Sequence, residues 1–105
     1  MPTTEDVILG SLCQYLKIKK YVFWRQNNIP VFDVRRGMYR RMPKWSRKGV
    51  SDIIAMKDGK VFFIEAKSKG KYLSKEQKIF KADVESQGCT HILARSTDDL
   101  RANGV

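Results

Sequence analysis

The sequence has no long hydrophobic run and very little cysteine or histidine. None of its apolar stretches approaches the roughly 20 residues of a membrane helix, and its first residues lack the basic and hydrophobic regions of a secretory signal. The two cysteines, Cys13 and Cys89, form no CxxC motif. We therefore expect a cytoplasmic protein without a membrane partner, a zinc site or a disulfide framework. The single histidine, His91, lies in an apolar stretch and is expected to be a core or edge residue rather than a general base.

Acidic residues are also scarce: 11 Asp and Glu stand against 21 Lys and Arg, a net charge of +10 on 105 residues. This length fits one domain spanning residues 1–105, and 42% apolar residues suffice for a core. Residues 17–48 contain eleven of the basic residues and only one acid, Asp33. Tyr21, Trp24, Tyr39 and Trp45 are interleaved with them, a mixture that suits phosphate contact and base stacking.

We expect the nucleic-acid contacts to come from the later part of this basic segment: Arg35, Arg36, Arg40, Arg41, Lys44, Trp45, Arg47 and Lys48. One alternative is a solvated basic face that only aids solubility. A weaker one is an anionic membrane surface, although the segment has no long amphipathic helix to lie on it.

Helix and strand signals alternate along the chain. Apolar spacing predicts a helix over residues 4–18, followed by extended segments at 21–26 and 31–34 and a basic loop over 35–48. Strands are expected at 50–56, 61–67 and 90–95, a helix from a Ser74 to Gln77 capping box through Ser86, and a last short helix capped by Thr97. The order α-β-β-β-β-α-β-α predicts the α/β class, with a mixed central sheet flanked by helices.

Two carboxylates converge if the central strands form a hairpin. A two-residue turn at Asp58-Gly59 would place Asp52 opposite Glu65, with Lys67 on the same side of the sheet. Facing like charges among apolar residues raise a pKa or require a cation, and Mg²⁺ is a suitable one beside phosphates. Alternatively, the strand ends protrude into water and these are ordinary surface charges.

Three motifs together resemble a known family: Gly49-Val-Ser-Asp52, Phe63-Ile-Glu-Ala-Lys67 and Leu73-Ser-Lys-Glu-Gln77. They are similar to the signature of the VRR-NUC domain, a branch of the PD-(D/E)xK nuclease superfamily, over most of the chain. The resemblance implies a restriction-endonuclease-like core and hydrolysis of DNA phosphodiesters by a metal-activated water. Its small stand-alone members, from phage and mobile elements, resemble Holliday-junction resolvases that act as homodimers.

The resemblance also implies a role for each site residue. The implied ligands of Mg²⁺ or Mn²⁺ are Glu5 (directly or through water), Asp52, Glu65 and the backbone carbonyl of Ala66. Lys67 would orient or activate the water and offset charge on the phosphate. Gln77 would position the lysine or a metal-bound water, or would serve only as a capping residue. No small-molecule cofactor is implied. The alternatives are a nuclease acting on flaps or plain duplex, and a basic nucleic-acid-binding module without catalysis.

Overall fold

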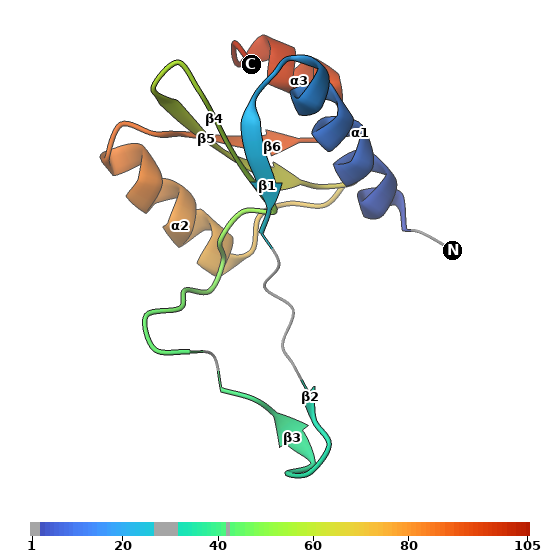
Figure 1. Cartoon of the computed structure of the whole chain (residues 1–105), viewed down its shortest axis with the longest axis vertical. Helices are drawn as coiled ribbons and strands as arrows, with labels where there is room; N and C mark the ends of the chain where they lie inside the picture. The colour runs from blue at the N-terminus through green and yellow to red at the C-terminus, as the bar shows by residue number, and fades with distance from the viewer. Residues whose placement is uncertain (1–2, 27–31, 42) are drawn as a thin grey trace.

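The computed structural model describes residues 3–26, 32–41 and 43–105, and two sheets and three helices lie within them (Figure 1). The elements in chain order are α1 (Thr4–Ile18), β1 (Val22–Arg25), β2 (Phe32–Asp33), β3 (Met38–Tyr39), β4 (Ile53–Lys57), β5 (Lys60–Ala66), α2 (Lys75–Ser86), β6 (Thr90–Ala94) and α3 (Thr97–Ala102). No helix in the described part of the chain is long and apolar enough to cross a membrane.

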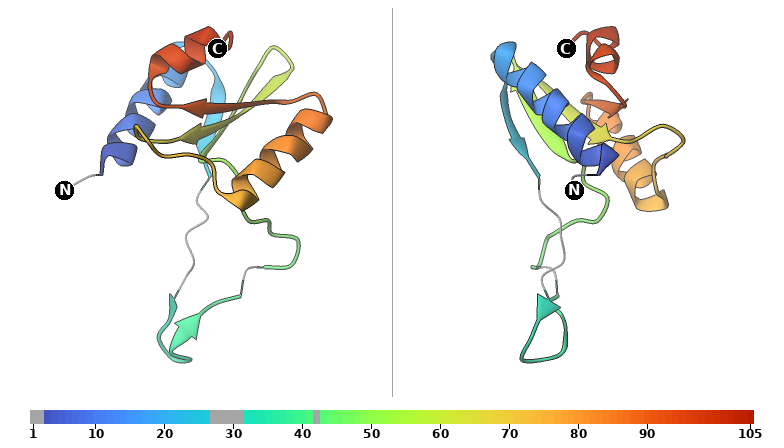
Figure 2. Two further views of the ribbon diagram at one scale, coloured as in Figure 1. Left: turned by 180° about the vertical axis from the view of Figure 1, so that it is seen from behind. Right: turned by 90° about the vertical axis from the view of Figure 1, so that its right-hand side faces the viewer.

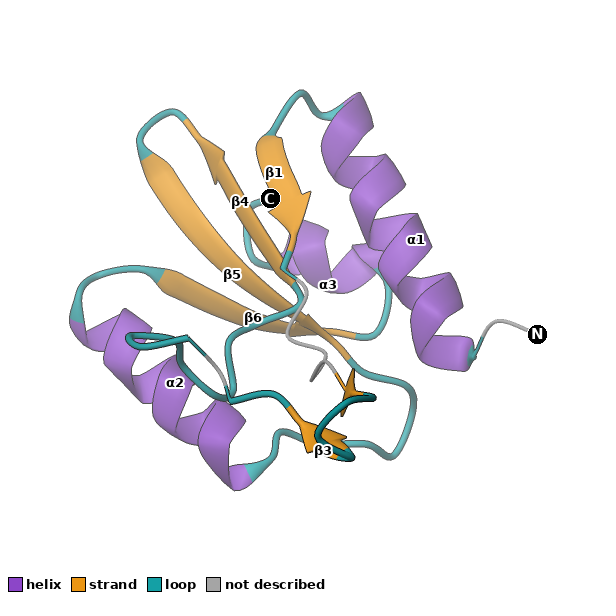
Figure 3. Ribbon diagram, turned by 60° about the horizontal axis from the view of Figure 1, so that its bottom comes forward, coloured by secondary structure: helices purple, strands orange, loops and turns teal. Residues whose placement is uncertain are grey.

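The main sheet has the strand order β1-β4-β5-β6. The β1–β4 and β4–β5 pairs are antiparallel, and β6 runs parallel to β5 after a crossover through α2. The predicted mixed sheet flanked by helices is therefore confirmed. Figure 3 shows α1 and α2 on opposite sides of the four strands.

The core fills the space between α1, α3 and one face of the sheet. Leu12 and Leu16 of α1 are fully buried against alternate residues of the central strands, such as Ile53 and Ile64, and Leu100 of α3 closes the cluster. Alternation along a strand directs the intervening residues to the opposite face, where α2 packs. That opposite face carries Glu65.

Capping residues mark the starts of α1 and α2. The Thr3 side chain and Asp6 form a capping box at the start of α1, and Ser74 with Gln77 forms another at α2. Gly88, at φ +82°, follows the end of α2 as expected of a C′ glycine. The predicted cap of α3 was wrong by one residue: Ser96, not Thr97, precedes the helix, and Thr97 is its first residue.

The basic loop predicted over residues 35–48 is wrong in part, because β3 lies within it and pairs with β2 in a small second sheet. The aromatic pair Phe32 and Tyr39, whose rings meet edge to face at 5.3 Å, favours this pairing. Figure 1 and both views of Figure 2 show this hairpin standing apart from the main sheet and its helices. Here "basic arm" means the described residues 32–41 and 43–49. Its strands raise the strand count before α2 to five, one more than predicted.

Candidate active site

The β4–β5 hairpin adopts the predicted register. Lys57 pairs with Lys60 around the Asp58-Gly59 turn, and Ile53 pairs with Ile64. Both turn residues have positive φ, as a tight two-residue hairpin requires. Continuing the register by one residue places Asp52 opposite Glu65. β4 begins at Ile53, not at residue 50 as predicted, so Asp52 lies immediately before the strand.

The Asp52 side chain reaches across to the neighbouring strand. Its Oδ2 accepts a hydrogen bond of 2.8 Å from the backbone N–H of Ala66. This contact leaves the other carboxylate oxygen of Asp52 for a further partner. The backbone of the hairpin thus holds the first carboxylate in place.

Glu65 is the most perturbed carboxyl of the site. It is only 3% exposed, and its Oε1 accepts a hydrogen bond of 3.1 Å from the side-chain amide of Gln77. Burial and the adjacent Asp52 carboxylate raise the pKa of Glu65 to about 8, and a hydrogen bond to Asp52 further favours its protonated form. In the ionised form, Oε2 is buried without a hydrogen-bond partner among the described residues. The alternative of ordinary surface charges is therefore wrong for Glu65.

The pair fits a divalent cation, although it supplies few ligands by itself. An unpartnered buried carboxylate oxygen beside a second carboxylate is stabilised by a cation, and hard ions prefer oxygen ligands. Within the described residues, no three His, Cys, Asp or Glu side chains gather closely enough to hold an ion. Further ligands would have to come from the Ala66 carbonyl, from water or from the substrate.

Lys67 and Glu5 both act on the Glu65 carboxyl through their charge. The Lys67 ammonium lowers the pKa of Glu65, in opposition to burial, and Lys67 follows Glu65 by two residues, on the same side of the sheet. Glu5, in the first turn of α1, makes the smallest of the contributions that raise this pKa. The structure thus brings Asp52, Glu65, Lys67 and Gln77 together, with Glu5 at the edge of the site.

Gln77 serves the capping role proposed from the sequence and also contacts Glu65, whereas its positioning of Lys67 or a metal-bound water stays a prediction. Its side-chain oxygen accepts from the N–H of Ser74 at 2.8 Å, which closes the capping box. Its side-chain nitrogen remains free to donate to Glu65. The start of α2 is therefore fastened directly to the buried carboxylate.

All eight residues predicted to contact DNA are exposed, but they are not equivalent. Trp45 is 90% exposed, and the Lys44 ammonium lies 5.2 Å from the centre of its ring. Arg47 instead forms an ion pair with Asp83 of α2, and its guanidinium lies over the Phe80 ring at 5.2 Å. Arg47 therefore anchors the arm to the body. Its charge is less available to phosphate than the sequence suggested.

Gln26, the last described residue before the arm, and Gly49, at the end of the arm, both contact residues of the carboxylate site or its neighbours. Before the arm, the N–H of Gln26 donates to the backbone carbonyl of Asp52 at 2.7 Å. At its other end, Gly49 has φ +79°, and a Cβ there would clash with the Glu76 carbonyl and lie 2.9 Å from the Gln77 nitrogen. Only glycine permits this close approach to the start of α2. The arm and the site therefore share their attachment points.

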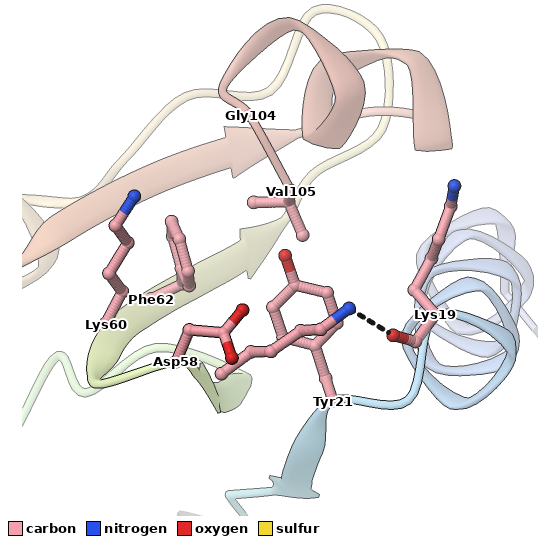
Figure 4. Close-up of a pocket in the computed structure, with 8 residues that line it drawn as sticks. Lys19, Tyr21, Asp58, Lys60, Phe62, Gly104 and Val105 are labelled. Atoms are coloured by element: carbon pink, nitrogen blue, oxygen red, sulfur yellow. Dashed lines mark hydrogen bonds between the residues drawn. The ribbon is translucent and has the colours of Figure 1, made fainter.

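Two other features lie apart from the site. His91 is 5% exposed, lies on the edge strand β6 and contacts the Phe80 ring edge to face, so the prediction of a core or edge residue is confirmed. A polar pocket of about 290 Å³ lies at the turn end of β4 and β5, away from Asp52 and Glu65 (Figure 4). There the Lys57 ammonium donates to the Lys19 carbonyl at 2.8 Å and lies over the Tyr21 ring.

Sequence reasoning missed two acidic residues that organise the arm. Asp83 holds Arg47, and no local pattern in the sequence connects them. Asp33 accepts hydrogen bonds from the N–H groups of Arg35 and Arg36 at 3.0 and 3.3 Å. An aspartate four residues before Gly37 is a turn signal that could have indicated this hairpin.

Comparisons with protein families, curated proteins and solved structures find no match to this chain.

Proposed function

We propose that this chain is a metal-dependent DNA endonuclease with a PD-(D/E)xK-type core of the VRR-NUC kind. The observation that carries the proposal is the pair formed by half-buried Asp52 and buried Glu65, with Lys67 beside it and an exposed basic arm attached to the same loops. Burial of facing carboxylates costs folding free energy. A binding-only basic module has no use for such a pair, which favours the catalytic interpretation.

Each residue would have a separate task in hydrolysis. Asp52 and Glu65, with the Ala66 carbonyl, would hold Mg²⁺ or Mn²⁺, and Glu5 would ligate directly or through water. The ion would polarise the scissile phosphate and lower the pKa of a water. Lys67 would orient that water and offset negative charge on the phosphate. Gln77 would hold Glu65 through its amide hydrogen bond.

The substrate that we propose is branched DNA, cleaved by a homodimer in the cytoplasm. Two coordinated cuts across a symmetric junction need two active sites, and two-fold assembly commonly provides them. The basic arm would supply positive charge for the phosphate backbone.

A divalent-metal titration tests the proposal. Wild type, Asp52→Asn and Lys67→Ala would be incubated with plasmid, flap and four-way-junction DNA at increasing Mg²⁺ or Mn²⁺. We expect metal-dependent cleavage by wild type only, fastest on the junction. Binding without cleavage at any metal concentration would instead support the non-catalytic module. Equal rates on all substrates would remove the preference for branches.

A further inference from the structure

The tip of the basic arm exposes an unusual amount of apolar surface. Phe32 is 50% exposed, Val34 84%, Met38 58% and Tyr39 64%, all within eight residues. The main core is complete without them, since it lies between the sheet, α1 and α3. An exposed apolar cluster that the fold does not need marks an interaction surface.

The hairpin's own contacts fix the shape of this tip. Asp33 accepts from two turn N–H groups through its side chain, and its carbonyl accepts from the N–H of Gly37 at 2.9 Å. Gly37 has φ +65°, which the turn requires. Because the turn is already ordered, little conformational entropy remains to be lost when a partner binds.

The charges around the tip identify its partner. The apolar side chains lie among Arg35, Arg36, Arg40 and Arg41, and Asp33, the single acid of this hairpin, is within 4.0 Å of the Arg36 and Arg40 guanidinium groups. The tip of a second copy, with the same four arginines, would be repelled from this one. Nucleic acid combines the two chemistries that match, since it has anionic phosphates outside and apolar base faces inside.

We infer that the β2–β3 hairpin is a wedge that enters DNA where the base stack is interrupted, with Val34 and Met38 against the exposed bases and the arginines on the flanking phosphates. This inference rests on the proposed function and adds the element that selects the substrate. Intact duplex must be unstacked before apolar side chains can enter, whereas a branch point already exposes base faces. The wedge therefore favours branched over continuous DNA.

The test measures binding in EDTA, where metal-dependent cleavage does not occur. The probes are a four-way junction with 2-aminopurine at the branch and a duplex of the same sequence. The double variant Val34→Ser/Met38→Ser should lose at least about tenfold in affinity for the junction and less than about twofold for the duplex. The rise in 2-aminopurine fluorescence on wild-type binding should also be lost.

A matched control separates the tip from apolar surface in general. Ile18→Ser removes a side chain that is 71% exposed at the end of α1, and it should leave both affinities unchanged. The melting temperature of the double variant should also stay the same, since Val34 and Met38 contact mainly solvent.

Three results would overturn the inference. The first is that the double variant loses equal affinity for junction and duplex. The second is that it raises the 2-aminopurine fluorescence as much as wild type does. The third is that it converts a dimer to a monomer, which would make the tip an interface between copies. Failure of the proposed function is distinguishable from these. A wild type that never cleaves with Mg²⁺ or Mn²⁺, but whose junction binding depends on the tip, would refute catalysis and retain the wedge.

Discussion

Replacing Glu65 by Gln should remove a pH dependence of stability that the wild type shows without metal. Burial and the Asp52 carboxylate raise the folded-state pKa of Glu65 from 4.5 to about 8. Between these two values the folded state binds more protons than the unfolded state, so the free energy of unfolding falls as pH rises. The stability that the raised pKa of Glu65 contributes is fully present below pH 4.5 and is lost as pH rises through about 8.

The magnitude follows from these two pKa values. From pH 7 to pH 9 the free energy of unfolding should fall by about 1.4 kcal/mol more in wild type than in Glu65→Gln. In a domain of this size that difference corresponds to roughly 6–11 °C in melting temperature. His91 and Cys13 also have shifted pKa values, caused mainly by burial, but both residues are present in the two proteins and cancel in the comparison.

The assay is thermal or urea unfolding in EDTA at several pH values, repeated with saturating Mg²⁺. A cation that binds the ionised pair stabilises the folded state more strongly as the competing proton leaves, so Mg²⁺ should reduce or reverse the slope in wild type only. Parallel pH profiles for the two proteins in EDTA would refute the reasoning, because Glu65 would then not titrate in this range. A Mg²⁺ effect of equal size in both proteins would place the ion elsewhere.

Four further predictions concern the lysine and the arm. Lys67→Ala should abolish cleavage while DNA affinity and Mg²⁺-induced stabilisation stay nearly unchanged; an unaltered single-turnover rate would remove Lys67 from the mechanism. Arg41→Gln should weaken binding to every DNA and flatten the plot of log affinity against log salt by roughly 0.9 on duplex. Arg47→Gln should mainly reduce the free energy of unfolding, by no more than about 1 kcal/mol, because its partly exposed ion pair anchors the arm to α2; a salt slope that changes as much as that of Arg41→Gln, with unchanged stability, would contradict this. Gly49→Ala should cost at least about 1 kcal/mol of stability and slow cleavage, whereas Gly37→Ala, with similar positive φ but open space around it, should cost less and leave the rate at saturating DNA unchanged; equal effects would show that the close approach to α2 is unimportant.

The sequence predicted the main sheet and the carboxylate pair because both depend on short-range patterns. The Asp58-Gly59 turn sets the register, and the register alone places Asp52 opposite Glu65. The capping box at Gln77 fixed the start of α2 in the same way. These features need only a few neighbouring residues, so one sequence suffices to find them.

The parts that the sequence did not predict depend on contacts between distant residues. Arg47 and Asp83 are 36 residues apart, and nothing near either of them indicates the pairing. The burial of Glu65 could be expected from its apolar neighbours, but the Gln77 hydrogen bond could not, because the capping role already accounted for that side chain. Because the pairing with Asp83 could not be foreseen, Arg47 was expected from the sequence to have the same DNA-binding role as the other basic residues of the arm.

The arm illustrates how binding and chemistry can be joined in a small domain. Before the arm, the Asp52 carbonyl accepts from Gln26. At the far end, Gly49 packs against the start of α2, and Arg47 pairs with Asp83 of the same helix. Asp52 is one of the two carboxylates, and Gln77 of α2 donates to the other, Glu65. In the proposed complex, a force on the arm from bound DNA would therefore act first on the residues that would hold the ion. In the proposed nuclease, this shared anchoring would be the most direct physical route from substrate shape to cleavage.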